Sequence, residues 1–114
     1  MRMRNVTTTL AALALASAFG LSVKAADPKV DKGMQVYADQ ICVLCHSIGD
    51  KGNKKGPLDA VGSKLSAADL RAWVVDAKGM TEKTKAPRKP VMKSYDLPKD
   101  DVDALVAYMA TLKK

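Results

Sequence analysis

The chain has 114 residues and a formal net charge of +7, with 19 Lys and Arg against 12 Asp and Glu, a length that fits one small domain. The charge is moderate and aromatic residues make up only 4% of the chain, so the basic stripe with interleaved aromatics of a nucleic-acid-binding surface is missing and we expect no nucleic-acid partner. Two cysteines are too few for the disulfide framework of a small secreted scaffold.

The amino-terminal residues have the pattern of a secretory signal peptide. Arg2 and Arg4 precede an apolar run from Leu10 to Phe19, and Val23-Lys24-Ala25 ends the stretch like a small-residue cleavage site. The alternative is an uncleaved membrane anchor, but the apolar run is shorter than the ~20 residues that a membrane-spanning helix needs.

We therefore expect residues 1–25 to be a signal peptide and residues 26–114 to form the domain. The mature protein would lie in the periplasm without a membrane span. It would keep 16 basic and 12 acidic residues, a net charge of +4.

A first helix is predicted to begin at Asp27-Pro28, where an aspartate can cap the helix and a proline fits its first turn. The helix would carry the sequence CVLCH (residues 42–46) at its carboxyl-terminal end. Residues 49–57, rich in Gly and Lys with one Asn and one Pro, are expected to form a loop. Apolar residues recur at helical spacing along the predicted helix: Val30, Met34, Tyr37, Ile41 and Leu44.

A second helix is expected to begin at Ser66, which together with Asp69 resembles the capping pair of a helix amino terminus. It would run to about residue 78 and end at Gly79, because glycine is the usual residue after a helix carboxyl terminus. Residues 79–95 contain prolines and many lysines, and we expect them to be irregular.

The last helix is predicted from Pro98 to Leu112. Acidic residues stand in its first turn and lysines follow its end, as the helix dipole favours, and its apolar residues recur at helical spacing. No strand pattern flanks the CVLCH sequence. We therefore predict an all-α fold with three main helices and long loops.

The CVLCH sequence carries the chemistry of the chain, because Cys-x-x-Cys-His is the attachment signature of haem c. Residues three apart on a helical turn face the same way, so Cys42 and Cys45 can form thioethers with the haem vinyl groups while His46 points at the iron. A redox thiol pair would need a thioredoxin-like βαβ setting. A structural zinc site needs four ligands, whereas His46 is the only histidine. We predict one covalent haem c with His46 as its proximal ligand.

The second axial ligand of the iron must come from another residue type or be absent. Met34 and Met109 fall on apolar helix faces and are expected to pack in the core. Met80 and Met92 lie in the segment expected to be irregular, where either sulfur could reach the iron. The residues by themselves leave Met92, Met80 and an open sixth position as alternatives.

The order of the motifs resembles small class I monohaem cytochromes c. The chain contains CVLCH at residues 42–46, Gly56-Pro57, MKSY at residues 92–95 and an acid-capped last helix ending in LVAYMATL at residues 105–112. The resemblance covers essentially the whole mature chain. It implies the cytochrome c fold, in which helices and long loops wrap around one covalent haem.

The resemblance also implies roles for particular residues. Met92 would be the distal iron ligand, and Lys93 stands where the family commonly has proline. The Pro57 carbonyl would accept a hydrogen bond from the ring nitrogen of His46 that does not bind iron.

Further positions match those at which the family crosses its terminal helices closely. They are Gly33 and Tyr37 on the first helix and Tyr108 on the last. We expect all three to be core residues.

Histidine and methionine ligation leaves no place on the iron for oxygen or a substrate, and a thioether ligand raises the reduction potential. We therefore predict a periplasmic single-electron carrier and not an enzyme. A haem redox subunit of a periplasmic dehydrogenase or oxidase complex is an alternative, and so is a haem sensor or catalyst with an open sixth position.

Charge gives an indication of the partner. Residues 78–93, which we call the basic segment, hold six basic residues and one acidic residue, a net charge of +5. We expect this segment to steer a redox partner protein with an acidic docking surface toward the haem edge; the alternative is a solvated loop without a partner. We expect the protein to be a monomer.

Overall fold

The computed structural model describes residues 27–114, so the predicted signal peptide lies outside the described residues. The elements in chain order are α1 (Pro28–Asp39), the 3₁₀ turn η1 (Cys42–Leu44), β1 (Ser47–Ile48), β2 (Lys51–Gly52), α2 (Val61–Lys64), α3 (Ala67–Val75), α4 (Ala77–Thr84) and α5 (Lys99–Thr111). The predicted helical fold is confirmed. The only strands within residues 27–114, β1 and β2, pair in a small antiparallel hairpin.

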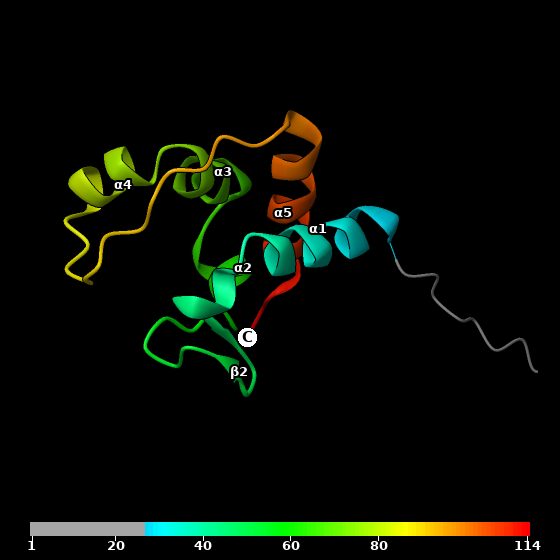
Figure 1. The fold of residues 1–114 in the computed structure, drawn as a ribbon, viewed down its shortest axis with the longest axis horizontal. Coiled ribbons are helices and arrows are strands. Elements are labelled where there is room, and N and C mark those ends of the chain that lie inside the picture. The colour runs from blue at the N-terminus through cyan, green and yellow to red at the C-terminus, as the bar shows by residue number, and fades with distance from the viewer. Residues whose placement is uncertain (1–26) are drawn as a thin grey trace, which may run out of the picture.

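The crossing of α1 over α5 organises the domain (Figure 1). A Cβ atom on Gly33 would collide with the Ala104 carbonyl oxygen and would lie 2.7 Å from the Tyr108 Cβ. The rings of Tyr37 and Tyr108 meet edge to face across the crossing, with centroids 6.0 Å apart. The predicted close crossing of the terminal helices is confirmed, and it depends on the missing side chain of Gly33.

Helix α1 is shorter than the sequence pattern indicated. It ends at Asp39, and Ile41 adopts a left-handed backbone with φ of 53°. Met34, Ile41 and Leu44 of the predicted apolar stripe are 50%, 54% and 70% exposed. Tyr37 of that stripe is buried as predicted, and so is Gly33; together with Val36 they form the buried face of α1, because these residues contact α5. The prediction that Met34 packs in the core is therefore wrong.

The predicted second helix is divided into α3 and α4 at Asp76. Ser66 caps α3 as expected, its hydroxyl accepting from the Asp69 amide at 3.2 Å. The Asp76 carboxylate in turn accepts from the amide of Gly79 at 3.1 Å and begins α4. The predicted helix end at Gly79 is therefore wrong. Gly79 lies in the first turn of α4, and the irregular chain begins only at Lys85.

Helix α5 confirms the prediction for the carboxyl-terminal part of the chain. Its last residues lie beside α2, where the Gly62 amide donates to the Leu112 carbonyl at 2.8 Å (Figure 1). Asp103 of α5 forms ion pairs with Arg71 of α3 and with Lys99. The core cluster draws on α1, α3 and α5 and consists of Val36, Tyr37, Leu70, Val74, Val102, Leu105, Val106 and Met109.

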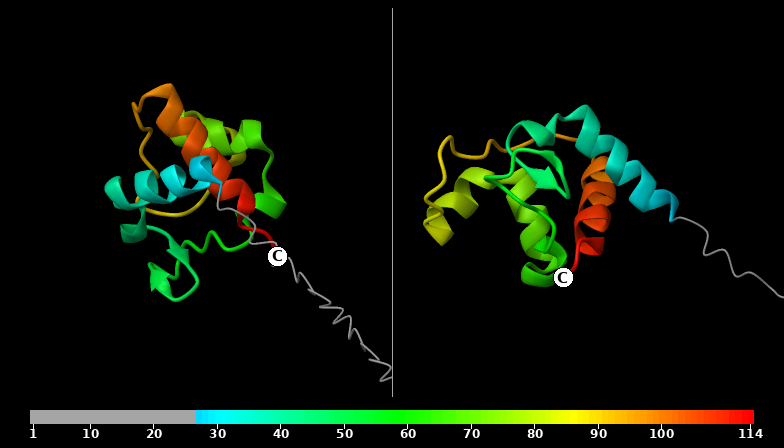
Figure 2. Two further views of the ribbon diagram at one scale, coloured as in Figure 1. Left: turned by 90° about the vertical axis from the view of Figure 1, so that its right-hand side faces the viewer. Right: turned by 90° about the horizontal axis from the view of Figure 1, so that it is seen from below.

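The irregular chain between α4 and α5 runs back along the molecule from the far end of α4 to the start of α5 (Figures 1 and 2). On its way it is tied to α3, since the Tyr95 amide donates to the Val74 carbonyl at 2.8 Å. Among residues 27–114, no helix is long and apolar enough to cross a membrane.

Candidate haem-binding site

The turn after α1 gathers the three residues of the attachment motif. The Cys42 carbonyl accepts from the amides of Cys45 at 3.1 Å and His46 at 2.9 Å. This tight turn holds both thiols and the imidazole within five consecutive residues of fixed backbone. Both cysteines are free thiols; Cys42 is half-buried and Cys45 is exposed.

These side chains open onto a large apolar cavity of about 490 Å³, within the usual range of roughly 300–1,000 Å³ for ligand sites. Apolar residues from the turn after α1, from the loop before α2, from α2, α3 and α5 and from the 86–95 chain make up most of its wall. They include Ile41, Leu44, Leu58, Val61, Leu65, Leu70, Trp73, Val74, Val91, Leu105 and Met109. The thiol pair, the imidazole and this apolar wall fit a covalently attached haem.

A hydrogen bond fixes the imidazole of His46. Its Nδ1 donates to the Gly56 carbonyl at 3.0 Å, which leaves Nε2 for a metal. The predicted acceptor, the Pro57 carbonyl, is therefore corrected to that of Gly56. The cause is the pairing of Ser47 with Pro57: the Ser47 amide donates to Gly56 at 3.1 Å, so the Gly56 carbonyl faces the His46 side.

The surroundings keep His46 in the form that binds metals. Burial lowers the pKa of His46, the hydrogen bond to Gly56 raises the pKa, and the positive charge of Arg88 lowers it. A lowered pKa favours the neutral imidazole, which is the ligating form. Burial raises the pKa of the Cys42 thiol, and Lys93 opposes this rise.

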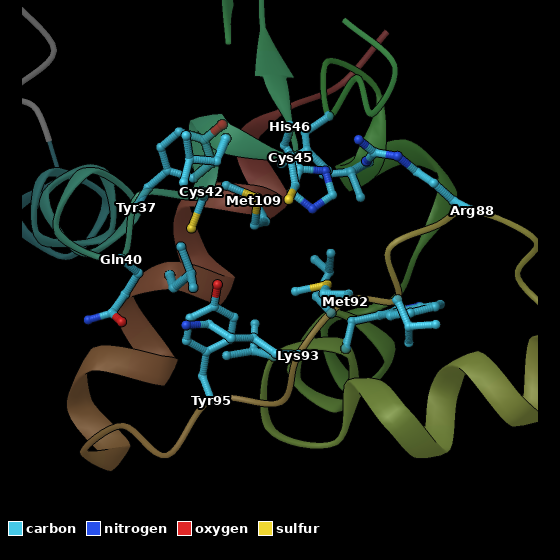
Figure 3. Close-up of a pocket in the computed structure, with 18 of the residues that line it drawn as sticks. Tyr37, Gln40, Cys42, Cys45, His46, Arg88, Met92, Lys93, Tyr95 and Met109 are labelled. Carbon is cyan, nitrogen blue, oxygen red and sulfur yellow. The ribbon is translucent and has the colours of Figure 1, made fainter. Parts of the chain in front are cut away.

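The methionines take different places. Met92 lines the cavity on the side opposite His46 (Figure 3). Met80 is buried in α4 and is not part of the cavity wall. Met109 lines the cavity from the core face of α5. The structure thus brings Met92 and His46 to one cavity and leaves Met80 outside it.

Two residues of the site have no clear sequence signal. Gly56 supplies the acceptor for His46, but nothing in its position before Pro57 says which carbonyl will turn inward. Arg88 lines the cavity from the basic segment, where the sequence shows only one more cation among many. Tyr95 of the MKSY sequence also lines the cavity.

A bare-metal site is not supported. Within the described part of the chain, no group of three or more His, Cys, Asp and Glu side chains is placed to hold a metal ion. Structural zinc, by comparison, needs four ligands around one point.

Comparisons with known proteins agree with this geometry. The chain is 27% identical over 106 aligned positions to cytochrome c oxidase subunit 2 of Alkalihalophilus pseudofirmus, an alignment that covers 82% of this chain and 30% of the relative. The chain thus corresponds to less than a third of that protein's length. No solved structure gives a significant match. The family model for cytochrome c matches residues 30–113, and the chain therefore belongs to the cytochrome c family, which implies covalent haem c and electron transfer.

Proposed function

We propose that this protein carries single electrons on one haem c, which Cys42 and Cys45 would hold covalently and whose iron His46 and Met92 would ligate. The observation that carries the proposal is the placement of His46 and Met92 on opposite sides of one apolar cavity, beside the two thiols (Figure 3). A histidine nitrogen and a methionine sulfur together form the ligand pair of electron-carrying cytochromes c.

Each residue has a part in this function. Bound haem supplies a one-electron Fe(III)/Fe(II) couple. The two thiols hold the cofactor in place, and the Gly56 carbonyl fixes the ring orientation of His46. The apolar wall excludes water, so little around the site has to rearrange when an electron is gained or lost. Such a site suits electron transfer better than bond chemistry.

We also propose that the protein lies in the periplasm and docks with a partner through an acidic surface of that partner. Cleavage of residues 1–25 would release residues 26–114 as a monomer into the periplasm. The basic segment forms part of the cavity wall through residues such as Arg88 and Lys93. Two cations of this segment, whose net charge is +5, therefore lie at the cavity, which supports docking to an acidic surface.

The visible spectrum of the haem-loaded protein tests the ligands. We expect oxidised wild type to show the weak far-red band of sulfur-to-iron ligation and Met92→Ala to lose it. Met34→Ala, which changes a methionine that is 50% exposed, serves as the matched control and should keep the band. If wild type is instead high-spin and binds carbon monoxide when reduced, the proposal is wrong and the protein is a sensor or catalyst. Loss of the band in Met80→Ala alone would move the ligand to Met80.

A second candidate is a redox subunit of a larger oxidase complex. It is favoured by the similarity to an oxidase subunit, of which the chain covers 30%. Size-exclusion chromatography of native extract distinguishes the two functions: the haem absorbance elutes at about the mass of the free domain for a carrier and with a large complex for a subunit.

A further inference from the structure

Arg88 is placed at the cavity from the side of the proximal histidine. It belongs to the irregular chain between α4 and α5, is half-buried and lines the cavity. Its side chain extends toward the His46 side of the site (Figure 3). A Cβ atom on Gly56 would collide with the guanidinium, so Arg88 packs directly on the residue whose carbonyl holds His46.

The guanidinium has no anionic partner within residues 27–114. The ion pairs found there join Lys32 to Asp101 and Asp103 to Arg71 and Lys99, and no Asp or Glu lines the cavity. No hydrogen bond from the guanidinium to another described residue is formed. A half-buried cation beside an apolar wall is costly unless an anion accompanies it.

The other flexible cation of the wall is already engaged. The Lys93 ammonium lies 4.9 Å from the centre of the Tyr95 ring, a cation–π contact, and Lys93 is exposed to solvent. Arg88 is therefore the cation of the cavity wall that lacks a partner in the described part of the chain.

We propose that Arg88 is a positioning residue for the cofactor, pairing its guanidinium with a propionate carboxylate of haem. The proposal rests on the proposed function, because it requires haem in this cavity. The planar guanidinium of an arginine can donate two parallel hydrogen bonds to one carboxylate, a bidentate ion pair that we call the two-pronged contact. The cofactor would thus bring the anion that the cavity wall lacks.

This pairing has an electrostatic consequence. A fixed positive charge close to the haem disfavours the extra positive charge of Fe(III) relative to Fe(II). Removing the cation should therefore lower the midpoint potential.

The test uses haem-loaded protein and two readouts: the midpoint potential, and the propionate bending mode in the resonance Raman spectrum. Arg88→Met should lower the potential and shift the mode. Arg88→Lys should recover most of the potential while the mode stays shifted, because an ammonium cannot make the two-pronged contact. Lys89→Met removes one charge from the adjacent exposed residue, which does not line the cavity, and should leave the mode unchanged.

Two results would overturn the pairing. One is an Arg88→Met protein that matches Lys89→Met in both readouts. The other is a propionate mode that shifts in Lys93→Met and not in the Arg88 variants. Arg88→Gln provides a second neutral variant if Arg88→Met does not mature. Failure of the proposed function would be seen separately, as a missing far-red band in wild type.

Discussion

The hydroxyl of Tyr37 is buried and has no hydrogen-bond partner among the described residues. Its ring is held between α1 and α5 against Tyr108, so the hydroxyl cannot turn to solvent. Burial raises the pKa of Tyr37 to about 12, with smaller contributions from Cys42 and Tyr108. A buried polar group without a partner costs stability, which makes Tyr37 a useful residue for a stability test.

We expect Tyr37→Phe to keep or raise stability at neutral pH and to reduce the alkaline loss of stability. The raised pKa means that the folded protein keeps a proton that the unfolded chain releases from pH 10 upward. Stability from this group is therefore complete below pH 10 and is lost as the pH rises toward about 12. Urea unfolding at pH 7 and pH 11 measures the difference.

Tyr108→Phe is the comparison for this substitution, since burial also raises the pKa of Tyr108 but its hydroxyl is not an unpaired buried atom. If Tyr37→Phe loses as much unfolding free energy between pH 7 and pH 11 as wild type does, Tyr37 does not cause the alkaline loss of stability.

The site residues differ in how far the sequence determines them. Cys42, Cys45 and His46 follow from a local spacing, because one turn of backbone is enough to gather them. The acceptor of the His46 hydrogen bond does not, because Gly56 and Pro57 are equally near in sequence. The bridge between Ser47 and Pro57 decides which carbonyl faces the ring.

Among the secondary-structure elements, α1 and α5 cross so closely at Gly33 that a Cβ atom there has no space. We expect Gly33→Ala to destabilise the protein by about 1–3 kcal/mol, the usual cost of overpacking, because the new Cβ would meet the backbone of Ala104. A backbone carbonyl in a helix cannot move aside as a flexible side chain can. Urea unfolding followed by circular dichroism measures the loss.

Gln35→Ala serves as the control for Gly33→Ala, since Gln35 is an exposed residue of the same helix. It should change stability little. Equal stability of Gly33→Ala and wild type would mean that the two helices separate at no cost, against the packing described above.

Element boundaries were the part of the fold that sequence patterns predicted least well. The apolar stripe from Val30 to Leu44 combines a helix face with residues of the cavity wall, so periodicity extended α1 past its true end at Asp39. Gly79 signalled a helix end, but the Asp76 carboxylate accepts its amide and starts α4. In both places a tertiary or capping contact outweighed a local preference.

In the molecule as a whole, the cavity and the hydrophobic core share part of their residues. The cavity of about 490 Å³ is bounded by residues of α1, α3 and α5 that also form the core cluster. No large side chain among the described residues is fully buried. A domain of this size gains only a small margin of stability from its own apolar contacts.

We therefore expect a haem-free chain, made by Cys42→Ala with Cys45→Ala, to lose fixed tertiary packing while keeping part of its helix. Far-ultraviolet circular dichroism should retain helical signal. Near-ultraviolet signal from Trp73, which lines the cavity, should collapse, and a hydrophobic dye should bind. Cooperative unfolding of this variant with an intact Trp73 signal would contradict the prediction.

The charge of the basic segment predicts how the protein reacts with small redox partners. Oxidation of the reduced protein by an anionic complex such as ferricyanide should slow by roughly tenfold from low to high salt, because screening removes the attraction. A cationic cobalt complex should show the opposite trend. Stopped-flow rates at several salt concentrations measure both.

Two double variants, each replacing two lysines by glutamates, test whether the position of the charge matters. Lys85→Glu with Lys89→Glu lies in the basic segment and should weaken the salt dependence with ferricyanide. Lys29→Glu with Lys64→Glu changes exposed lysines of α1 and α2 and should have a smaller effect. Equal effects of the two pairs would mean that only the net charge matters.

Local patterns in the chain are enough to predict the attachment motif, the haem c that this motif implies, the helical class of the fold and the last helix, because each of these depends on residues close together in the chain. Three contacts could not be predicted in this way: Gly56 holds His46, Met92 lines the cavity while Met80 does not, and Arg88 packs against Gly56. Those contacts join segments ten or more residues apart, and packing selects them from several positions that are equivalent in sequence.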